Sequence, residues 1–219
     1  MKKILFSLIL GALFSQNAIA DDRMKKFAVT ISNAHAFHVL TPIVITAHKR
    51  NFSLFKIGEP ASEGLAFQAE FGDPSMLMAE LADNSRVYST ASNGGLLLPG
   101  KSTTIEIMAP RRSWFSVSSM LAGTNDAFIA VKNLKAPRHH KPKMSATRVY
   151  DAGSEADNED CAYIPGPPCG PDSGNQRATE NAEGFVSISN GVHGGVDLNP
   201  MDSDWREPVA VISIKQLHY

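Results

Sequence analysis

The sequence has few cysteines and no excess of charge. Only two of its 219 residues are cysteine, too few for a disulfide-rich scaffold or a four-thiolate zinc site. Its 21 Lys and Arg residues nearly balance 22 Asp and Glu residues. A dedicated nucleic-acid-binding protein would carry a basic excess, so we expect no nucleic-acid partner.

Common catalytic motifs are also missing. The chain has no G-x-S-x-G nucleophile motif, no G-x-G-x-x-G or P-loop, and no H-E-x-x-H zinc motif. We therefore expect no catalysis. An alternative from a different class stays open, in which an acidic loop and a histidine such as His193 form a metal-dependent hydrolase.

Long apolar runs are absent except at the N-terminus. There Lys2 and Lys3 precede an apolar stretch over residues 4–14, and Ala18-Ile19-Ala20 follows as a cleavage signature. This order is typical of a bacterial secretory signal peptide. The run is shorter than the about 20 residues that span a bilayer. We expect a signal peptide at 1–20, a single domain at 21–219 that is periplasmic or secreted, and no transmembrane segment after cleavage.

The two cysteines, Cys161 and Cys169, lie eight positions apart in a stretch rich in Pro and Gly. In an oxidising compartment such a pair is expected to form a disulfide. Closing this loop stabilises the fold by about 2.5 kcal/mol in the chain-entropy model. The alternative, a redox pair, lacks the C-x-x-C spacing.

Short segments of alternating apolar and polar residues predict β-strands. They cover residues 27–32, 42–47, 103–107, 127–131, 185–189 and 208–214. Gly and Pro turn signals separate them, which favours an all-β sandwich or barrel. One helix is predicted with Pro60 at its first position and Gly72 at its end, and a shorter one over 76–81. Residues 151–184 read as a long loop.

Two places are candidates for metal binding. Five carboxylates fall within residues 151–160, and such a cluster becomes favourable when a hard cation such as calcium sits among the oxygens. Asp126 comes directly before the apolar strand at 127–131, at that strand's edge, where a loop carboxylate can meet another loop. The alternatives are a solvated acidic loop and a carboxylate that caps its own turn. Elsewhere, the basic run at 135–143, with His139 and His140, is a solvated loop or a contact for an anionic surface.

These segments together resemble the spondin domain in its stand-alone bacterial form. The most specific matches are T-N-D-A-F at 124–128 and Y-D-A-G-S-E at 150–155. Other matching stretches, in order along the chain, lie at residues 40–42, 58–62, 69–72, 98–100, 119–121 and 208–210.

The resemblance implies an antiparallel β-sandwich with one or two short helices and long loops, and a calcium ion at one end. Carried over by position, the ligands are Asp126, Asp151 and Glu155. Glu155 stands where animal members tend to have Asp, so this ligand arm is one methylene longer. Whether Asp157, Glu159 or Asp160 also contact the metal stays open.

The implied function is calcium-dependent adhesion or recognition. The animal members carry further modules for which this chain has no room, so their partners are not transferred. Carbohydrate, lipopolysaccharide and protein remain open as extracellular or envelope ligands, and so does the oligomeric state. The third alternative is a structural, envelope-associated spacer whose carboxylates are merely solvated.

Overall fold

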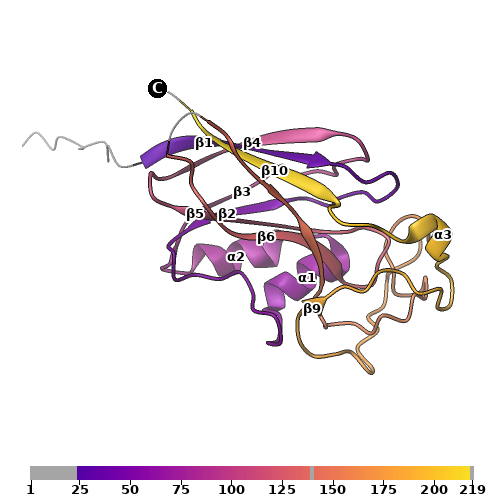
Figure 1. Cartoon of the computed structure of the whole chain (residues 1–219). Coiled ribbons are helices and arrows are strands. Elements are labelled where there is room, and N and C mark those ends of the chain that lie inside the picture. Colours follow the sequence, from indigo (N-terminus) through magenta and orange to yellow (C-terminus); the bar gives the residue numbers. More distant parts are fainter. Residues whose placement is uncertain (1–23, 139–140, 218–219) are drawn as a thin grey trace, which may run out of the picture.

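The computed structural model describes residues 24–138 and 141–217. They form two antiparallel sheets stacked face to face, with two helices on one side and long loops at one end (Figure 1). This confirms the predicted β-sandwich. The predicted signal peptide and the His139-His140 pair lie outside the described residues. Within the described part of the chain, no helix is long and apolar enough to cross a bilayer.

One sheet has four strands and the other six, and every paired strand is antiparallel. The four-stranded sheet has the order β4 (Ser102–Pro110), β1 (Met24–Asn33), β10 (Ala210–Gln216) and β7 (Lys143–Ala146). The six-stranded sheet has the order β3 (Val87–Ser92), β2 (Val44–His48), β5 (Trp114–Met120), β6 (Ala127–Lys135), β8 (Arg148–Asp151) and β9 (Ser187–Ile188).

The main core lies between the two sheets. Alternate residues of β1 point inward and are fully buried, as the period-two pattern predicts. The rings of Phe27 in one sheet and Phe115 in the other meet edge to face, with their centroids 5.1 Å apart. Burying such apolar surface is the largest favourable contribution to folding.

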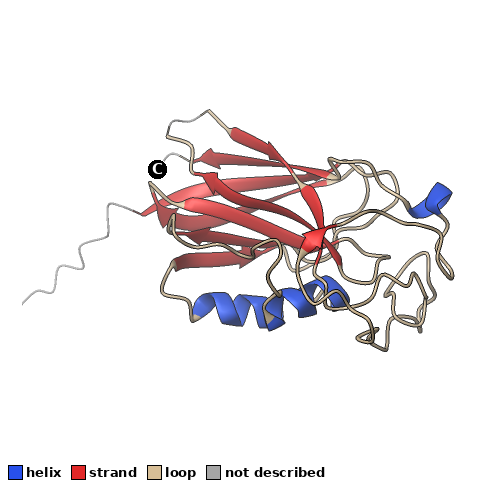
Figure 2. Cartoon of the chain, turned by 60° about the horizontal axis from the view of Figure 1, so that its bottom comes forward, coloured by secondary structure: helices blue, strands red, loops and turns tan. Residues whose placement is uncertain are grey.

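A second core lies on the outer face of the six-stranded sheet, which α1 (Glu63–Phe71) and α2 (Ser75–Ala82) cover (Figure 2). It contains Leu65 and Leu77 from the helices and Phe128 from β6. The next residue along β6, Ile129, belongs instead to the core between the sheets. Both faces of β6 are therefore buried over residues 127–131, which explains the unbroken apolar sequence of this part of the strand.

The beginning of α1 differs from the prediction. The helix starts at Glu63 rather than at Pro60, because the Ser62 side chain caps it by accepting a hydrogen bond from the backbone N–H of Leu65 at 3.3 Å. The predicted end is confirmed, since Gly72 adopts the left-handed conformation with φ of 69°.

The sequence pattern missed β5, which is buried along almost its whole length. Its outward-facing serines obscure the apolar alternation, yet they are buried. Ser118 donates to Gln68 Oε1 on α1 at 2.7 Å, and Ser116 Oγ lies 2.9 Å from His48 Nε2 on β2. Hydrogen bonds to neighbouring side chains make burial of these hydroxyls tolerable.

The predicted strand at 185–189 is shorter than expected, because only β9 pairs with β8. Val186 bonds instead to the segment before α1: its N–H donates to Glu59 O, and its carbonyl accepts from Gly58 N. Between β8 and β9 the chain forms the predicted long loop. After β9 a further loop carries the short helix α3 (Pro200–Ser203) at the same end of the sandwich (Figure 1).

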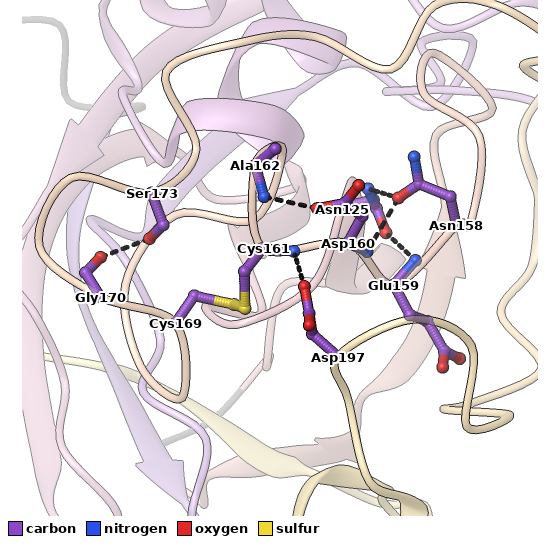
Figure 3. Close-up of a disulfide and its surroundings, with 10 residues drawn as sticks. All are labelled: Asn125, Asn158, Glu159, Asp160, Cys161, Ala162, Cys169, Gly170, Ser173 and Asp197. Carbon is purple, nitrogen blue, oxygen red and sulfur yellow. Dashed lines mark hydrogen bonds between the residues drawn. A yellow bond between two sulfur atoms is a disulfide. The ribbon is translucent and has the colours of Figure 1, made fainter.

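The disulfide between Cys161 and Cys169 forms within this long loop, as predicted (Figure 3). The two Cα atoms lie 5.3 Å apart. Next to it, the backbone N–H of Cys161 donates to Asp197 Oδ2 at 2.9 Å. The disulfide thus closes a short ring within the loop between β8 and β9. The hydrogen bond to Asp197 joins this loop to the segment before α3.

We expect replacement of both cysteines by alanine to lower the free energy of unfolding by about 2.5 kcal/mol, because the unfolded chain gains loop entropy. Urea denaturation of oxidised protein and of the double variant measures the difference. Reduced wild-type protein is the control and should match the variant. Coinciding midpoints for all three samples would contradict the prediction.

Candidate metal centre

The pairing of β6 with β8 brings the two predicted metal-binding segments together. In this ladder Ala127 lies opposite Asp151. Asp126, which precedes Ala127, is therefore next to the residue that follows Asp151, and the backbone N–H of Ala152 donates to Asp126 O at 3.3 Å. Two carboxylates that are 25 positions apart in sequence thus share one end of the sheet.

The Asp126 side chain has no exposed surface. Its Oδ2 accepts three hydrogen bonds from the loop after β8: from Ser154 N at 2.7 Å, Ser154 Oγ at 3.0 Å and Glu155 N at 3.0 Å. Its Oδ1 is buried without a hydrogen-bond partner. Asp126 therefore holds the acidic loop instead of capping its own turn, and one of its oxygens stays unsatisfied.

Three carboxylates can share one ion. One oxygen from each of Asp126, Asp151 and Asp157 lies within 4.8 Å of the others. The first two side chains are buried, whereas Asp157 is exposed and closes the group on the solvent side. The Asp151 carboxylate also accepts from Gly153 N at 2.6 Å, which tightens the turn that follows β8.

Glu155 lies beside this group. Its side chain is buried, with 1% exposure, and Oε1 accepts from Ala178 N at 3.0 Å. Its Oε2 is a second buried carboxylate oxygen without a hydrogen-bond partner. Glu70 of α1, whose charge also acts on Glu155, forms an ion pair with Arg177 at 2.5 Å. The charge of Glu70 is therefore already neutralised.

The electrostatics of the group oppose full ionisation. Burial, followed by the charges of Asp126 and Asp157, raises the pKa of Asp151 to about 9. Burial also raises the pKa of Asp126 to about 6 and that of Glu155 to about 8. The pKa of Asp157 is raised as well, mainly because its carboxyl is partly desolvated even though the residue as a whole is exposed. Without a cation these carboxyls retain protons at pH values where isolated carboxyls have lost them.

The rest of the acidic loop is anchored by side-chain amides (Figure 3). Asn125 Oδ1 accepts from Glu159 N at 3.2 Å, and its Nδ2 donates to Asn158 Oδ1 at 3.1 Å. The Glu159 carboxylate accepts from the backbone N–H groups of His193 and Gly195. Glu159 therefore fixes the loop after β9 and is not one of the three grouped carboxylates.

Of the three carboxylates that the sequence left open, only Asp157 joins the group. Asp160 caps a turn, accepting from Ala162 N at 2.8 Å. Asp157 is two positions after Glu155, but a loop has no fixed periodicity, so spacing could not separate it from Glu159 or Asp160. Asn125 was visible within T-N-D-A-F, yet its anchoring role depends on contacts made 33 positions later.

The hydrolase alternative needs a deep pocket that holds both an imidazole and an open metal position. The cavity lined by Asp157 and Glu159 measures about 10 Å³, which is room for about one water molecule. The His193 side chain is 58% exposed, with Nδ1 3.6 Å from Glu159 Oε1. This geometry offers a substrate no enclosed place beside the aspartates.

The turn after Asp151 requires glycine at 153. Gly153 has φ of 66°, and a Cβ there would lie 2.2 Å from the carbonyl oxygen of Phe185. We expect Gly153→Ala to lower the melting temperature clearly more than Gly94→Ala. Gly94 has the same φ but open space around it, so this control carries only the backbone cost of about 1–2 kcal/mol. Thermal melts measure both, and equal shifts would contradict the predicted clash.

Comparison with known proteins supports the likeness seen in the sequence. The family described as Spondin_N matches residues 25–158, which is more than half of the chain. The match ends within the acidic loop and includes Asp126, Asp151 and Asp157. Comparison with curated proteins finds no match. The chain therefore belongs to the spondin N-terminal domain family.

Proposed function

We propose that this protein is an exported, calcium-binding recognition module without catalytic activity. The proposal is supported chiefly by the buried carboxylate of Asp126, whose Oδ1 has no donor and lies among other acidic side chains. An unpaired buried charge is costly, and a cation bound at this point would offset that cost. The family membership agrees with a non-catalytic module.

The donor set fits calcium. All side-chain donors are hard carboxylate oxygens, and calcium takes six to eight oxygen ligands in flexible geometry. Asp126, Asp151 and Asp157 would hold the ion, and Glu155 Oε2 would supply a further oxygen. Backbone carbonyls and water would complete the shell. The absence of thiolate or imidazole donors among these four residues makes zinc a poor match.

Calcium would fix the loops that form the recognition surface. Asp126 bonds to residues 154 and 155, and Asn125 and Glu159 extend the network to the loop after β9. An ion bound to Asp126 and Asp157 would add a second link between the start of β6 and the loop after β8. Loops on a rigid scaffold are common binding sites, and carbohydrate, lipopolysaccharide or protein is the expected class of ligand.

Calcium should raise the melting temperature relative to EDTA, because it binds the folded state. At calcium about a hundredfold above Kd the gain is about 2.7 kcal/mol, or roughly 5–10 °C for a protein of this size. Differential scanning fluorimetry measures the shift. Identical curves in calcium and EDTA would reject the site and favour the structural-spacer alternative.

Asp151→Asn should abolish this calcium response while leaving the fold intact, because the metal-free protein already holds this carboxyl protonated and asparagine is its neutral counterpart. The matched control is Asp83→Asn, which removes an exposed carboxylate after α2. The control should retain the full shift. A full shift in the Asp151 variant would remove this residue from the ligand set.

The stability of the metal-free protein should fall as pH rises between about 4 and 9. In this window the unfolded carboxyls, with ordinary pKa values of 3.8 to 4.5, lose protons that Asp126, Asp151 and Glu155 retain when folded. The folded state then binds more protons, so its stability decreases with pH. Melting temperatures in EDTA across this range test the sign. Calcium should flatten the profile, and a rise with pH would contradict it.

A further inference from the structure

The end of the sandwich opposite the metal centre carries a patch of exposed cations. Arg111 and Arg112 form the turn between β4 and β5 and are both exposed. This turn connects the two sheets. Arg111 Nη2 lies 3.5 Å from the carbonyl oxygen of Arg138, so the exposed Arg138, just after β6, belongs to the same surface.

Three lysines extend the patch across the four-stranded sheet. Lys141 and Lys143 are exposed at the start of β7, and Lys215 is exposed near the end of β10. In the ladder between these strands Lys143 lies opposite Ile214, the neighbour of Lys215. Since β4 and β7 are the two edges of this sheet, the patch is about 14 Å wide, or three strand spacings.

Among the described residues, the strands that reach this end carry almost no carboxylate to balance these cations. These eight strands, β1 to β7 and β10, contain one acidic residue, Glu106, and it pairs with Lys26 at 2.8 Å. By contrast, 12 of the 22 Asp and Glu residues fall between residues 151 and 207, in the loops at the other end (Figure 1). Although the net charge is near zero, positive and negative charges are therefore concentrated at opposite ends of the molecule.

Strand β6 connects the two ends. Asp126 precedes its first residue, and Lys135 is its last. Nine residues at about 3.4 Å each place the cations roughly 30 Å from the aspartates. At this distance salt screens one site from the other, so the two can act independently.

An exposed apolar side chain lies within the basic patch. Met144, directly after Lys143, is 64% exposed. A soluble polyanion would bind the cations and leave this side chain in water. A lipid surface offers phosphate groups to the cations and an apolar region to the methionine.

We propose that this basic end docks on a membrane surface of anionic phospholipids and directs the metal end away from the bilayer. The proposal goes beyond calcium-dependent recognition and does not need the ion. Each Lys or Arg near an anionic surface strengthens binding several-fold, so six cations suffice for reversible attachment. The attachment is electrostatic and weakens as salt rises.

The test is co-sedimentation of the purified protein in EDTA with vesicles of phosphatidylcholine, with and without phosphatidylglycerol. We expect binding to the anionic vesicles only, and its loss in high salt. Arg111→Glu with Arg112→Glu should weaken binding about tenfold or more. Lys141→Glu with Lys143→Glu, on a different segment, should do the same, which guards against a local folding defect in either pair.

The matched control is Lys101→Glu with Arg148→Glu, which changes the net charge equally at exposed positions outside the patch. It should bind like wild type. Equal loss in this control, equal binding to neutral vesicles, or no binding to anionic vesicles would overturn the proposal. Binding to heparin or duplex DNA without binding to vesicles would overturn it as well. Because all arms contain EDTA, failure here is distinguishable from failure of the calcium site.

Discussion

The structure of the loop end depends on the ladder between β6 and β8. Pairing of Ala127 with Asp151 places two carboxylates side by side at the end of a sheet whose two faces are buried. Both side chains are buried there. The loop after β8 donates its N–H groups to Asp126, while the other carboxylate oxygen has no hydrogen-bond partner and is one that a bound cation would satisfy.

The segment after the family match completes this scaffold. The match ends at residue 158, yet β10 lies between β1 and β7 in the middle of the four-stranded sheet. Without β10, β1 would expose an edge and the inward residues Ile212 and Ile214 would be missing from the core. The disulfide and Glu159 hold the intervening loops in place, so the family-matched segment and the segment after it fold as one unit.

A sandwich with acidic loops at one end and basic turns at the other has a dipole along its strands. Strand β6 sets the separation, because its buried length determines how far Asp126 lies from Lys135. Repulsion among the carboxylates stays local, since salt screens charges beyond about 10 Å. A cation bound at the aspartates would leave the cationic end equally unaffected. The same fold can therefore present two surfaces of opposite chemistry.

Local patterns in the sequence determined the alternating strands such as β1, the end of α1 at Gly72, the short loop that the disulfide closes, and the two segments that carry the acidic residues. These features depend on contacts close in sequence or on strict periodicity. Only the tertiary structure decided that Asp157 rather than Glu159 groups with Asp126, that Ser118 of β5 is buried against α1, and that cations from distant turns share one surface. Each of these depends on pairing between remote segments, which period and spacing along the chain do not encode.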